Sequence, residues 1–292
     1  MPLASFTERR NKLRALFNRD VITSPASVFD AVSARMAQGL GFEYGLLGGS
    51  VASYVVLGAP DIIVLTLTEF VEQCRRITRA SDLPLVVDAD HGYGNAMNTR
   101  RTIEELEAAG VAGLTIEDTV LPRPYGGGPN ELIPVDEFRD KLRGAVDARI
   151  DPSFMIIGRT AIRSDEETIA RARACKDAGC DAIFVNGRGT LDLIEAVYRE
   201  TGLPLIANRV PGTKEELFAR GVRVQYLGHQ PYYVMLKALQ DAYVTLKDGG
   251  TGADLAPLTI AGAERDTAFA DREYTRARAE YLRDELTLSA PE

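Results

Sequence analysis

Residues 83–94 read LPLVVDADHGYG, a short apolar segment that ends abruptly in acidic residues and glycines. Its first part, Leu83 to Val87, is continuously apolar rather than alternating, which is typical of a strand buried on both faces of a parallel sheet. Stretches with helical spacing separate this run from seven similar ones. Those runs are Val21 to Thr23, Tyr44 to Leu47, Gly113 to Ile116, Phe154 to Ile157, Ala182 to Val185, Leu203 to Ile206 and Arg223 to Leu227. The alternation predicts βαβ units around a parallel sheet.

The stretches between the runs carry helical signals of their own. Phe70, Val71, Cys74 and Ile77 recur at the spacing of one helix face, and their charged neighbours are left for water. Eight strand–helix repeats, with no sign of a reversed strand order, predict an α/β fold of the closed (β/α)8 TIM-barrel type. A dinucleotide-binding fold is excluded because the glycines between Gly45 and Gly49 lack the G-x-G-x-x-G spacing.

The count of repeats also predicts the domain organisation. We expect residues 1–248 to form the barrel with an amphipathic N-terminal helix, and residues 249–292 to form an additional C-terminal helical extension. Within the extension, a linker rich in Gly and Thr runs to Leu258, and a charged helix runs from Glu264 to Glu285. A narrow apolar stripe on that helix consists of Tyr274, Ala277 and Tyr281. Such a stripe suits packing on another surface, so we expect the extension to take part in subunit contacts.

The composition excludes several classes of function. With 45% hydrophobic and 26% charged residues the chain is globular, and a net charge of −8 without a basic block excludes nucleic acid as a partner. The longest uncharged run, Tyr44 to Pro60, is too short and too rich in glycine to cross a membrane. Three scattered cysteines without a CxxC pair, and no visible export signal, predict a cytoplasmic protein. Two histidines are too few for a His-rich zinc site.

Acidic residues gather where the predicted strands end, which is where a barrel places its active site. Asp88 and Asp90 follow the third strand, Glu117 follows the fourth, and Asp61 comes from the loop after the second. Carboxylates that converge in this way repel one another unless a cation lies between them. Oxygen ligands in an open site favour Mg²⁺, with Mn²⁺ as the other possibility, and several waters would stay bound. The alternative is that these acids cap helix N-termini.

Donor groups follow other strands. Gly48 and Gly49 before Ser50 would let backbone N–H groups approach the carboxylate of a substrate, or they could simply form a tight turn. Arg159, after the fifth strand, needs a carboxylate partner from the protein or from a substrate. His229, after the eighth, is either a functional residue at the barrel mouth or an inert residue at the start of a helix.

These motifs resemble the isocitrate lyase and phosphoenolpyruvate mutase superfamily. The resemblance rests on the run from Asp88 to Asn95, on the segment Thr115 to Asp118 and on Gly48-Gly49-Ser50, and it extends over roughly residues 20–245. It implies an α/β barrel, 2-oxo acid or enolate chemistry, and Mg²⁺ held directly or through water. The acids that match the metal ligands of the superfamily are Asp61, Asp88, Asp90 and Glu117.

The loop after the fourth strand distinguishes between branches of the superfamily. The carbon–carbon lyases carry a catalytic Cys there in a Lys-Lys-Cys-Gly-His motif, whereas residues 119–128 read TVLPRPYGGG. The chain is therefore more similar to the branch that decarboxylates oxaloacetate. This resemblance implies loss of CO₂ to give pyruvate through a metal-bound enolate. Gly49 and Ser50 would bind the C1 carboxylate, and Arg159 with His229 would bind and orient the C4 carboxylate.

Other functions remain possible. The chain could be a carbon–carbon lyase or a phosphonopyruvate-type enzyme with a different proton donor, and a non-catalytic barrel disagrees with the acidic cluster. The expected partners are a small 2-oxo dicarboxylate and further copies of the chain, because members of the superfamily often exchange a C-terminal helix and form tetramers.

Overall fold

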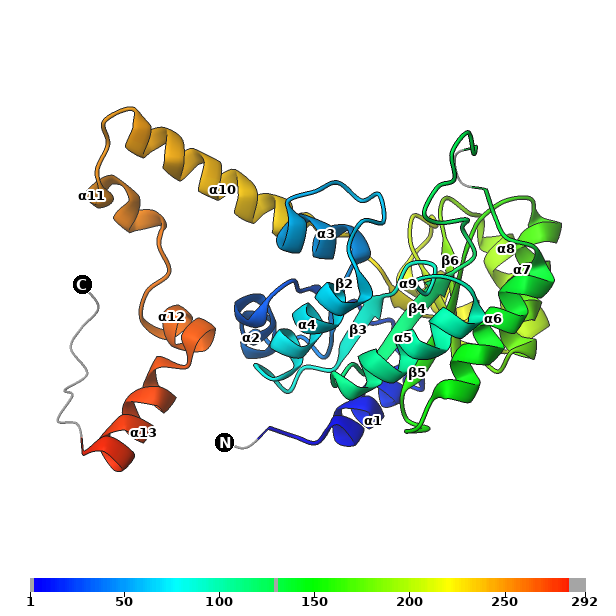
Figure 1. Cartoon of the computed structure of the whole chain (residues 1–292), viewed down its shortest axis with the longest axis horizontal. Helices are drawn as coiled ribbons and strands as arrows, with labels where there is room; N and C mark the ends of the chain where they lie inside the picture. The colour runs from blue at the N-terminus through cyan, green and yellow to red at the C-terminus, as the bar shows by residue number, and fades with distance from the viewer. Residues whose placement is uncertain (1–2, 129–130, 284–292) are drawn as a thin grey trace.

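The computed structural model describes residues 3–128 and 131–283, in which the predicted alternation of strands and helices is present (Figure 1). Eight strands form one parallel sheet: β1 (Ala26–Ser27), β2 (Gly45–Leu47), β3 (Leu85–Asp88), β4 (Gly113–Glu117), β5 (Met155–Ala161), β6 (Ala182–Asn186), β7 (Leu205–Ala207) and β8 (Val222–Gln225). Each strand pairs with the next in the order of the sequence. A bridge between Thr23 and Val224 joins the two ends of the sheet. The predicted (β/α)8 fold is confirmed.

The first strand differs from the prediction. The run Val21 to Thr23 contributes only the isolated bridge, in which the Thr23 N–H donates to the Arg223 carbonyl at 3.0 Å. Strand β1 begins three residues after Thr23, and the N–H of Ala26 donates to the carbonyl of Tyr44 at 3.1 Å. A two-residue strand is too short to form an apolar run in the sequence, so the pattern favours the more apolar segment that precedes it.

Helices surround the sheet on its outside. They are α2 (Ala31–Gly39), α4 (Leu67–Thr78), α5 (Ala96–Ala108), α6 (Val135–Ala148), α7 (Asp165–Asp177), α8 (Leu191–Thr201) and α9 (Lys214–Ala219), while α3 (Gly49–Leu57) is a further helix directly after β2. The predicted face of α4 is correct, because Phe70, Val71, Cys74 and Ile77 are all buried. This layer of helices and the outer face of the sheet form the larger of two apolar cores.

The second core fills the barrel itself. Helix α1 (Phe6–Phe17) contributes Leu13, Leu16 and Phe17, which pack with strand residues that point inward, among them Ile157 and Ile206. Its N-terminus is capped by Ser5, whose hydroxyl accepts from the Glu8 N–H. The amphipathic N-terminal helix is thus part of the barrel, and the interior is packed rather than open.

The chain after β8 leaves the barrel. Helix α10 (Gln230–Lys247) projects away from the sheet, and α11 (Gly252–Leu255), a 3₁₀ turn (Ala256–Leu258), α12 (Gly262–Phe269) and α13 (Asp271–Leu282) follow it (Figure 1). Within this segment α12 returns to pack on α2, and Ala268 is fully buried there. No helix in residues 3–128 or 131–283 has the length and apolar character needed to cross a membrane.

The C-terminal extension departs from the prediction in two respects. The linker before Leu258 contains short helical turns. The single charged helix predicted from Glu264 to Glu285 is two helices, separated at Ala270, whose φ is 58°. The Asp266 carboxylate accepts from the Arg272 N–H at 2.7 Å, which satisfies a backbone donor at the start of α13 and favours the break. Glu285 lies outside the described residues.

Candidate active site

A cavity of about 980 Å³ opens at the carboxyl ends of the strands. Its lining includes eight of the nine residues singled out from the sequence, which are Gly48, Ser50, Asp61, Asp88, Asp90, Glu117, Arg159 and His229. Gly49 lies beside it, in contact range of the Asp90 carboxylate. Residues from separate strand ends and loops therefore meet at one place, as the barrel topology predicts.

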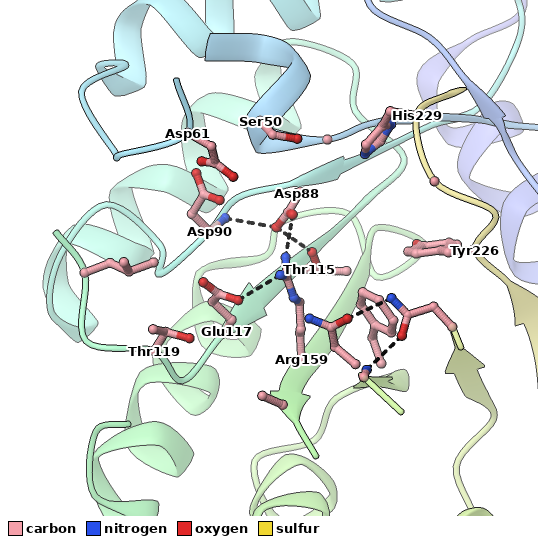
Figure 2. Close-up of a pocket in the computed structure, with 18 of the residues that line it drawn as sticks. Ser50, Asp61, Asp88, Asp90, Thr115, Glu117, Thr119, Arg159, Tyr226 and His229 are labelled. Atoms are coloured by element: carbon pink, nitrogen blue, oxygen red, sulfur yellow. Dashed lines mark hydrogen bonds and ion pairs between the residues drawn. The ribbon is translucent and has the colours of Figure 1, made fainter. Parts of the chain in front are cut away.

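Arg159 links two of the acids. Its guanidinium donates to Asp88 Oδ2 through Nη1 and lies 3.1 Å from Glu117 Oε2 through Nη2 (Figure 2). The guanidinium also lies over the ring of Phe184, with 5.5 Å from Cζ to the ring centroid. Burial opposes the charge, but the neighbouring carboxylates outweigh it and raise the pKa of Arg159, so the group stays cationic.

The backbone around Asp88 fixes the acidic motif. Asp88 Oδ1 accepts from the Thr115 hydroxyl at 3.1 Å and from the Asp90 N–H at 3.2 Å. Asp90 has a φ of 48°, in the left-handed region that residues other than glycine rarely adopt. Its carbonyl accepts from the Glu117 N–H at 2.7 Å, which joins the ends of β3 and β4. Strain of this kind is typical of functional sites.

Two of the acids, Asp61 and Asp90, have no cationic partner among the described residues. The carboxylates of Asp61 and Asp90 face one another (Figure 2), and neither makes an ion pair within residues 3–128 and 131–283. Burial, together with Asp88, raises the pKa of both carboxyl groups. Burial also raises the pKa of Glu117 to about 7; Arg159 opposes the shift and Asp88 adds to it. Such a cluster favours a bound cation.

The geometry bears on how a cation would be held. Within the described part of the chain, no three His, Cys, Asp or Glu side chains are arranged to ligate one metal ion directly. Mg²⁺ dehydrates reluctantly and commonly binds proteins through one or two carboxylates and several waters. The donor set of Asp61, Asp88, Asp90 and Glu117, all oxygen, fits such a hydrated ion, with part of the contact made through water.

The glycine segment begins helix α3. Gly48 is the N-cap residue and forms no side-chain cap, so the first N–H groups of the helix are open toward the cavity. A Cβ on Gly48 would collide with the imidazole of His229, and a Cβ on Gly49 would lie 2.5 Å from Asp90 Oδ1. The glycines are therefore required by close packing of side chains as well as by the turn.

His229 directly precedes the first residue of α10. It occupies the N-cap position, but its side chain makes no capping hydrogen bond. Its Nδ1 instead lies 2.8 Å from the hydroxyl of Ser27, which leaves Nε2 on the side of Gly48 and the cavity (Figure 2). Burial lowers the pKa of His229, although Asp88 acts in the opposite direction. The ring is therefore neutral near pH 7.

Asp118, next to Glu117, does not belong to the cavity. It is fully buried, where Oδ2 accepts from the Thr160 hydroxyl at 2.6 Å and from Arg171 Nη1 at 3.1 Å. Arg171 also donates to the Ile133 carbonyl at 3.0 Å. Asp118 begins the loop between β4 and α6, and Ile133 lies near its end. Through Thr160 and Arg171, both ends of this loop are attached to β5 and α7. The Asp118 carboxylate therefore has a structural role at this loop.

The cavity also contains residues that the sequence argument missed. Asn186, Asn208 and Tyr226 line it, and the Tyr226 hydroxyl is buried without a hydrogen-bond partner in the described structure. The rule that found the acids could have found the two asparagines, since Asn186 ends β6 and Asn208 directly follows β7. Tyr226 lies inside the run Arg223 to Leu227, which the sequence predicts to be a strand.

Comparison with known proteins identifies the family of this chain. The family model described as phosphoenolpyruvate phosphomutase matches residues 13–247. The chain belongs to this family. Its fold matches a phosphoenolpyruvate phosphomutase from Streptomyces platensis subsp. rosaceus, with a TM-score of 0.83, 28% identity and coverage of 94% of this chain and 99% of that one.

Closer relatives exist in sequence. An oxaloacetate decarboxylase from Rhodopseudomonas palustris strain BisB5 is 46% identical over 263 residues, which are 88% of this chain and 91% of that protein. Another solved structure, of phosphonopyruvate hydrolase in complex with oxalate and Mg²⁺, is 25% identical with a TM-score of 0.82, and the match covers 94% and 99% of the two chains. The expected resemblance to the isocitrate lyase and phosphoenolpyruvate mutase superfamily is confirmed.

Proposed function

We propose that this enzyme, a carboxy-lyase, decarboxylates oxaloacetate to pyruvate and CO₂ with the help of a divalent cation. The observation that carries the proposal is the pairing of a carboxylate cluster with a fixed guanidinium at one cavity. Relatives 46% identical over most of the chain are named for this reaction, and the three cysteines are all buried, outside the cavity lining. A thiol proton donor of the carbon–carbon lyase kind is therefore not available at the site.

The acids Asp61, Asp88, Asp90 and Glu117 would hold Mg²⁺, or alternatively Mn²⁺, directly or through water. When bound, the cation supplies Lewis-acid polarisation of the 2-oxo group of the substrate. A related protein of known structure was solved with oxalate and Mg²⁺, and oxalate shares the adjacent carboxylate and oxygen donors of a 2-oxo acid. These points support a metal requirement.

The remaining groups would bind and orient the substrate. The N–H groups of Gly49 and Ser50 at the start of α3 suit the C1 carboxylate, because a helix N-terminus favours an anion. Arg159 would stabilise the negative charge that develops on the C2 oxygen as the C3–C4 bond breaks. Its guanidinium is already held by Asp88 and Glu117, so no ordering cost falls on the reaction step.

His229 would act on the other carboxylate. Its imidazole is neutral, fixed by Ser27, and directed with Nε2 toward the cavity. From this position it would orient the C4 carboxylate for departure together with Arg159. Loss of CO₂ leaves the electron pair of the C3–C4 bond in the enolate of pyruvate, and uptake of a proton at C3 then gives pyruvate.

We also propose a cytoplasmic homo-oligomer, with a tetramer favoured. Support comes from α10, whose apolar side chains are exposed in the isolated chain. They include Tyr233, Val234, Met235, Leu236, Leu239, Tyr243 and Val244. A helix apolar on so much of its surface is typically covered by another surface. Three free cysteines are usual in a reducing compartment.

The proposal is tested with a panel of substrates. Purified enzyme with Mg²⁺ is given oxaloacetate, methylisocitrate, dimethylmalate and phosphonopyruvate, and the products are identified by NMR. We expect pyruvate and CO₂ from oxaloacetate at the highest kcat/KM. Faster cleavage of a 2-hydroxy acid, or release of phosphate from phosphonopyruvate, would assign the chain to another branch of the superfamily.

A further inference from the structure

The turn after β3, which carries Asp88 and Asp90, has an unusual backbone. Four of its residues have positive φ: 48° at Asp90, 78° at Gly92, 61° at Tyr93 and 145° at Gly94. Two of the four are not glycine, and residues with a side chain rarely adopt this region. A strained turn of this kind persists only where the surrounding structure holds it in place. The contacts that hold it therefore bear on the geometry of the acids.

Hydrogen bonds fix the carbonyl groups of the turn one by one. The carbonyls of Ala89, Asp90 and Gly92 accept from the turn itself at 2.8 Å, from the backbone of β4 at 2.7 Å and from a threonine hydroxyl of α5 at 3.1 Å, respectively. The carbonyl of His91 accepts from Lys141 Nζ at 3.1 Å, in a contact that is buried. Lys141 thus connects α6 to the turn.

Lys141 lies in surroundings that do not favour a charged group. It is 3% exposed, and among the described residues no carboxylate lies within ion-pair distance of its ammonium. Burial lowers the pKa of Lys141, while Glu137, Asp118 and Glu117 act in the opposite direction from farther away. Burying an ammonium costs free energy, and an apolar side chain of similar length would avoid that cost. The lysine is therefore better explained by a functional need than by stability.

The position of Lys141 suits an indirect role at the site. Lys141 and His91 lie outside the cavity lining, whereas the carboxylates of Asp88 and Asp90 belong to it (Figure 2). The carbonyl that Lys141 holds is one residue after Asp90. Movement of this carbonyl changes the dihedral angles of the turn and so displaces the Asp90 carboxylate, which packs closely against Gly49.

We infer that Lys141 is a positioning residue for the proposed metal site: its ammonium holds the His91 carbonyl and keeps the turn in the shape that presents Asp88 and Asp90 to a divalent cation. The inference rests on the metal site of the proposed function, and it does not depend on oxaloacetate as the substrate. It assigns to α6, which contributes no residue to the cavity lining, an influence on affinity for the cation.

Two substitutions and a matched control test this role. Lys141→Met keeps an unbranched side chain of similar length but leaves the His91 carbonyl without its donor. Lys141→Arg keeps a cationic N–H donor. Lys176→Met is the control, because Lys176 on α7 also donates to a backbone carbonyl, that of Glu200 at 3.2 Å, but is exposed.

The readouts separate cation affinity from stability. The dissociation constant of Mn²⁺ is measured without substrate from the electron paramagnetic resonance signal of free Mn²⁺. Urea unfolding of the metal-free proteins, followed by circular dichroism, gives the midpoint of each variant. Pyruvate release from oxaloacetate is measured separately on the wild type.

We expect Lys141→Met to weaken Mn²⁺ binding roughly ten- to a hundredfold, as is typical when a partner behind a metal ligand is lost. Its urea midpoint should change little, because the lost hydrogen bond is offset by removal of a buried charge. Lys141→Arg should recover part of the affinity, and Lys176→Met should bind Mn²⁺ as the wild type does.

Several results would overturn the inference. They are an unchanged Mn²⁺ constant in Lys141→Met, no recovery in Lys141→Arg, and a Lys141→Met chain that is unfolded without urea, since lysine would then serve folding. If the wild type itself bound no Mn²⁺, the proposed metal site would fall together with the inference. If the expected Mn²⁺ pattern held but the wild type released no pyruvate, the proposed reaction would fall and the role of Lys141 would stand.

Discussion

Arg159 contacts two of the four acids that we propose as metal ligands, so its removal changes the site in two ways. Arg159→Ala leaves Asp88 and Glu117 without their partner and removes the charge that stabilises the C2 oxygen. Loss of one charged hydrogen bond costs about 1.5–3 kcal/mol, so kcat/KM for oxaloacetate should fall by roughly tenfold to more than a hundredfold.

His229→Gln should have the smaller effect, mainly on kcat, because glutamine keeps a polar group beside Ser27. Steady-state kinetics of both variants, with melting curves as the control for folding, test the ranking. Unchanged oxaloacetate kinetics in His229→Gln would remove the role assigned to this residue.

The raised pKa of Glu117 gives a pH prediction. Its pKa rises from 4.5 to about 7 on folding, mainly through burial. Protonated Glu117 therefore favours the folded state below pH 4.5, and this stabilisation is lost as the pH rises through about 7. A bound cation compensates the ionised form. The increase in melting temperature produced by Mg²⁺ should thus be larger at about pH 8 than at about pH 5.5.

Glu117→Gln is the control for this measurement, because glutamine does not titrate. In that variant the difference between the two pH values should shrink. Equal stabilisation by Mg²⁺ at both pH values in the wild type would contradict the assignment of Glu117 to the metal site.

For individual residues, the sequence predicts which side chains reach the site when they directly follow a strand, because the topology alone brings the strand ends together. Asp88, Glu117 and Arg159 were found in this way. The contact of Lys141 with the His91 carbonyl could not be predicted, since only the folded structure brings α6 beside the turn after β3. The same holds for Asp118, whose partner Arg171 is 53 residues away.

The loop between β4 and α6 depends on one buried ion pair. Asp118 connects to Arg171, which also holds the Ile133 carbonyl at the far end of that loop. Removal of one partner from a buried pair leaves a charge uncompensated and costs about 3–5 kcal/mol. Asp118→Asn should therefore lower the free energy of unfolding by about 3 kcal/mol, because Glu167 still contacts Arg171 at 3.1 Å.

Glu167→Gln is the matched control at the same arginine. Glu167 is 41% exposed, and surface ion pairs contribute about 0–1 kcal/mol. Urea unfolding followed by circular dichroism measures both variants. Equal losses of unfolding free energy in the two variants would show that the Asp118–Arg171 ion pair stabilises the loop no more than the exposed pair does.

Helices and strands were predictable to different degrees. The buried face of α4 follows from its apolar spacing, because a helix of three turns repeats its pattern. Strand β1 has two residues and shows no pattern, so its place is set by pairing with β2. The break at Ala270 depends on a side-chain cap from Asp266, which competes with continuation of the helix and cannot be read from helical spacing.

At the scale of the whole molecule, helix α10 bears on whether copies of the chain associate. The helix that follows β8 is rich in apolar residues, and its sequence does not say which surface covers them. In the structure only Tyr232 of this helix is buried, against Phe29 and Tyr54. The rest of the apolar surface is exposed, which favours contact with a second copy of the chain.

Sedimentation velocity tests this proposal. The wild type should sediment as an oligomer at micromolar concentration, with a tetramer favoured. Leu239→Glu places a charge on the exposed apolar surface of α10 and should shift the distribution to smaller species, and truncation after Gly249 should do so through loss of the extension. A monomeric wild type, or a truncated chain of unchanged size and stability, would contradict it.

The central claim is that the acidic cluster and Arg159 together decarboxylate oxaloacetate with a divalent cation. The most direct measurement is the initial rate of pyruvate formation by enzyme freed of metal with a chelator, before and after addition of Mg²⁺. The rate with Mg²⁺ alone and the rate with Asp88→Ala serve as references. We expect no turnover by the chelated enzyme, full recovery with Mg²⁺, and a rate in the Asp88→Ala variant close to that of Mg²⁺ alone. Full turnover by chelated enzyme, or a wild-type rate no higher than that of Mg²⁺ alone, would contradict the account.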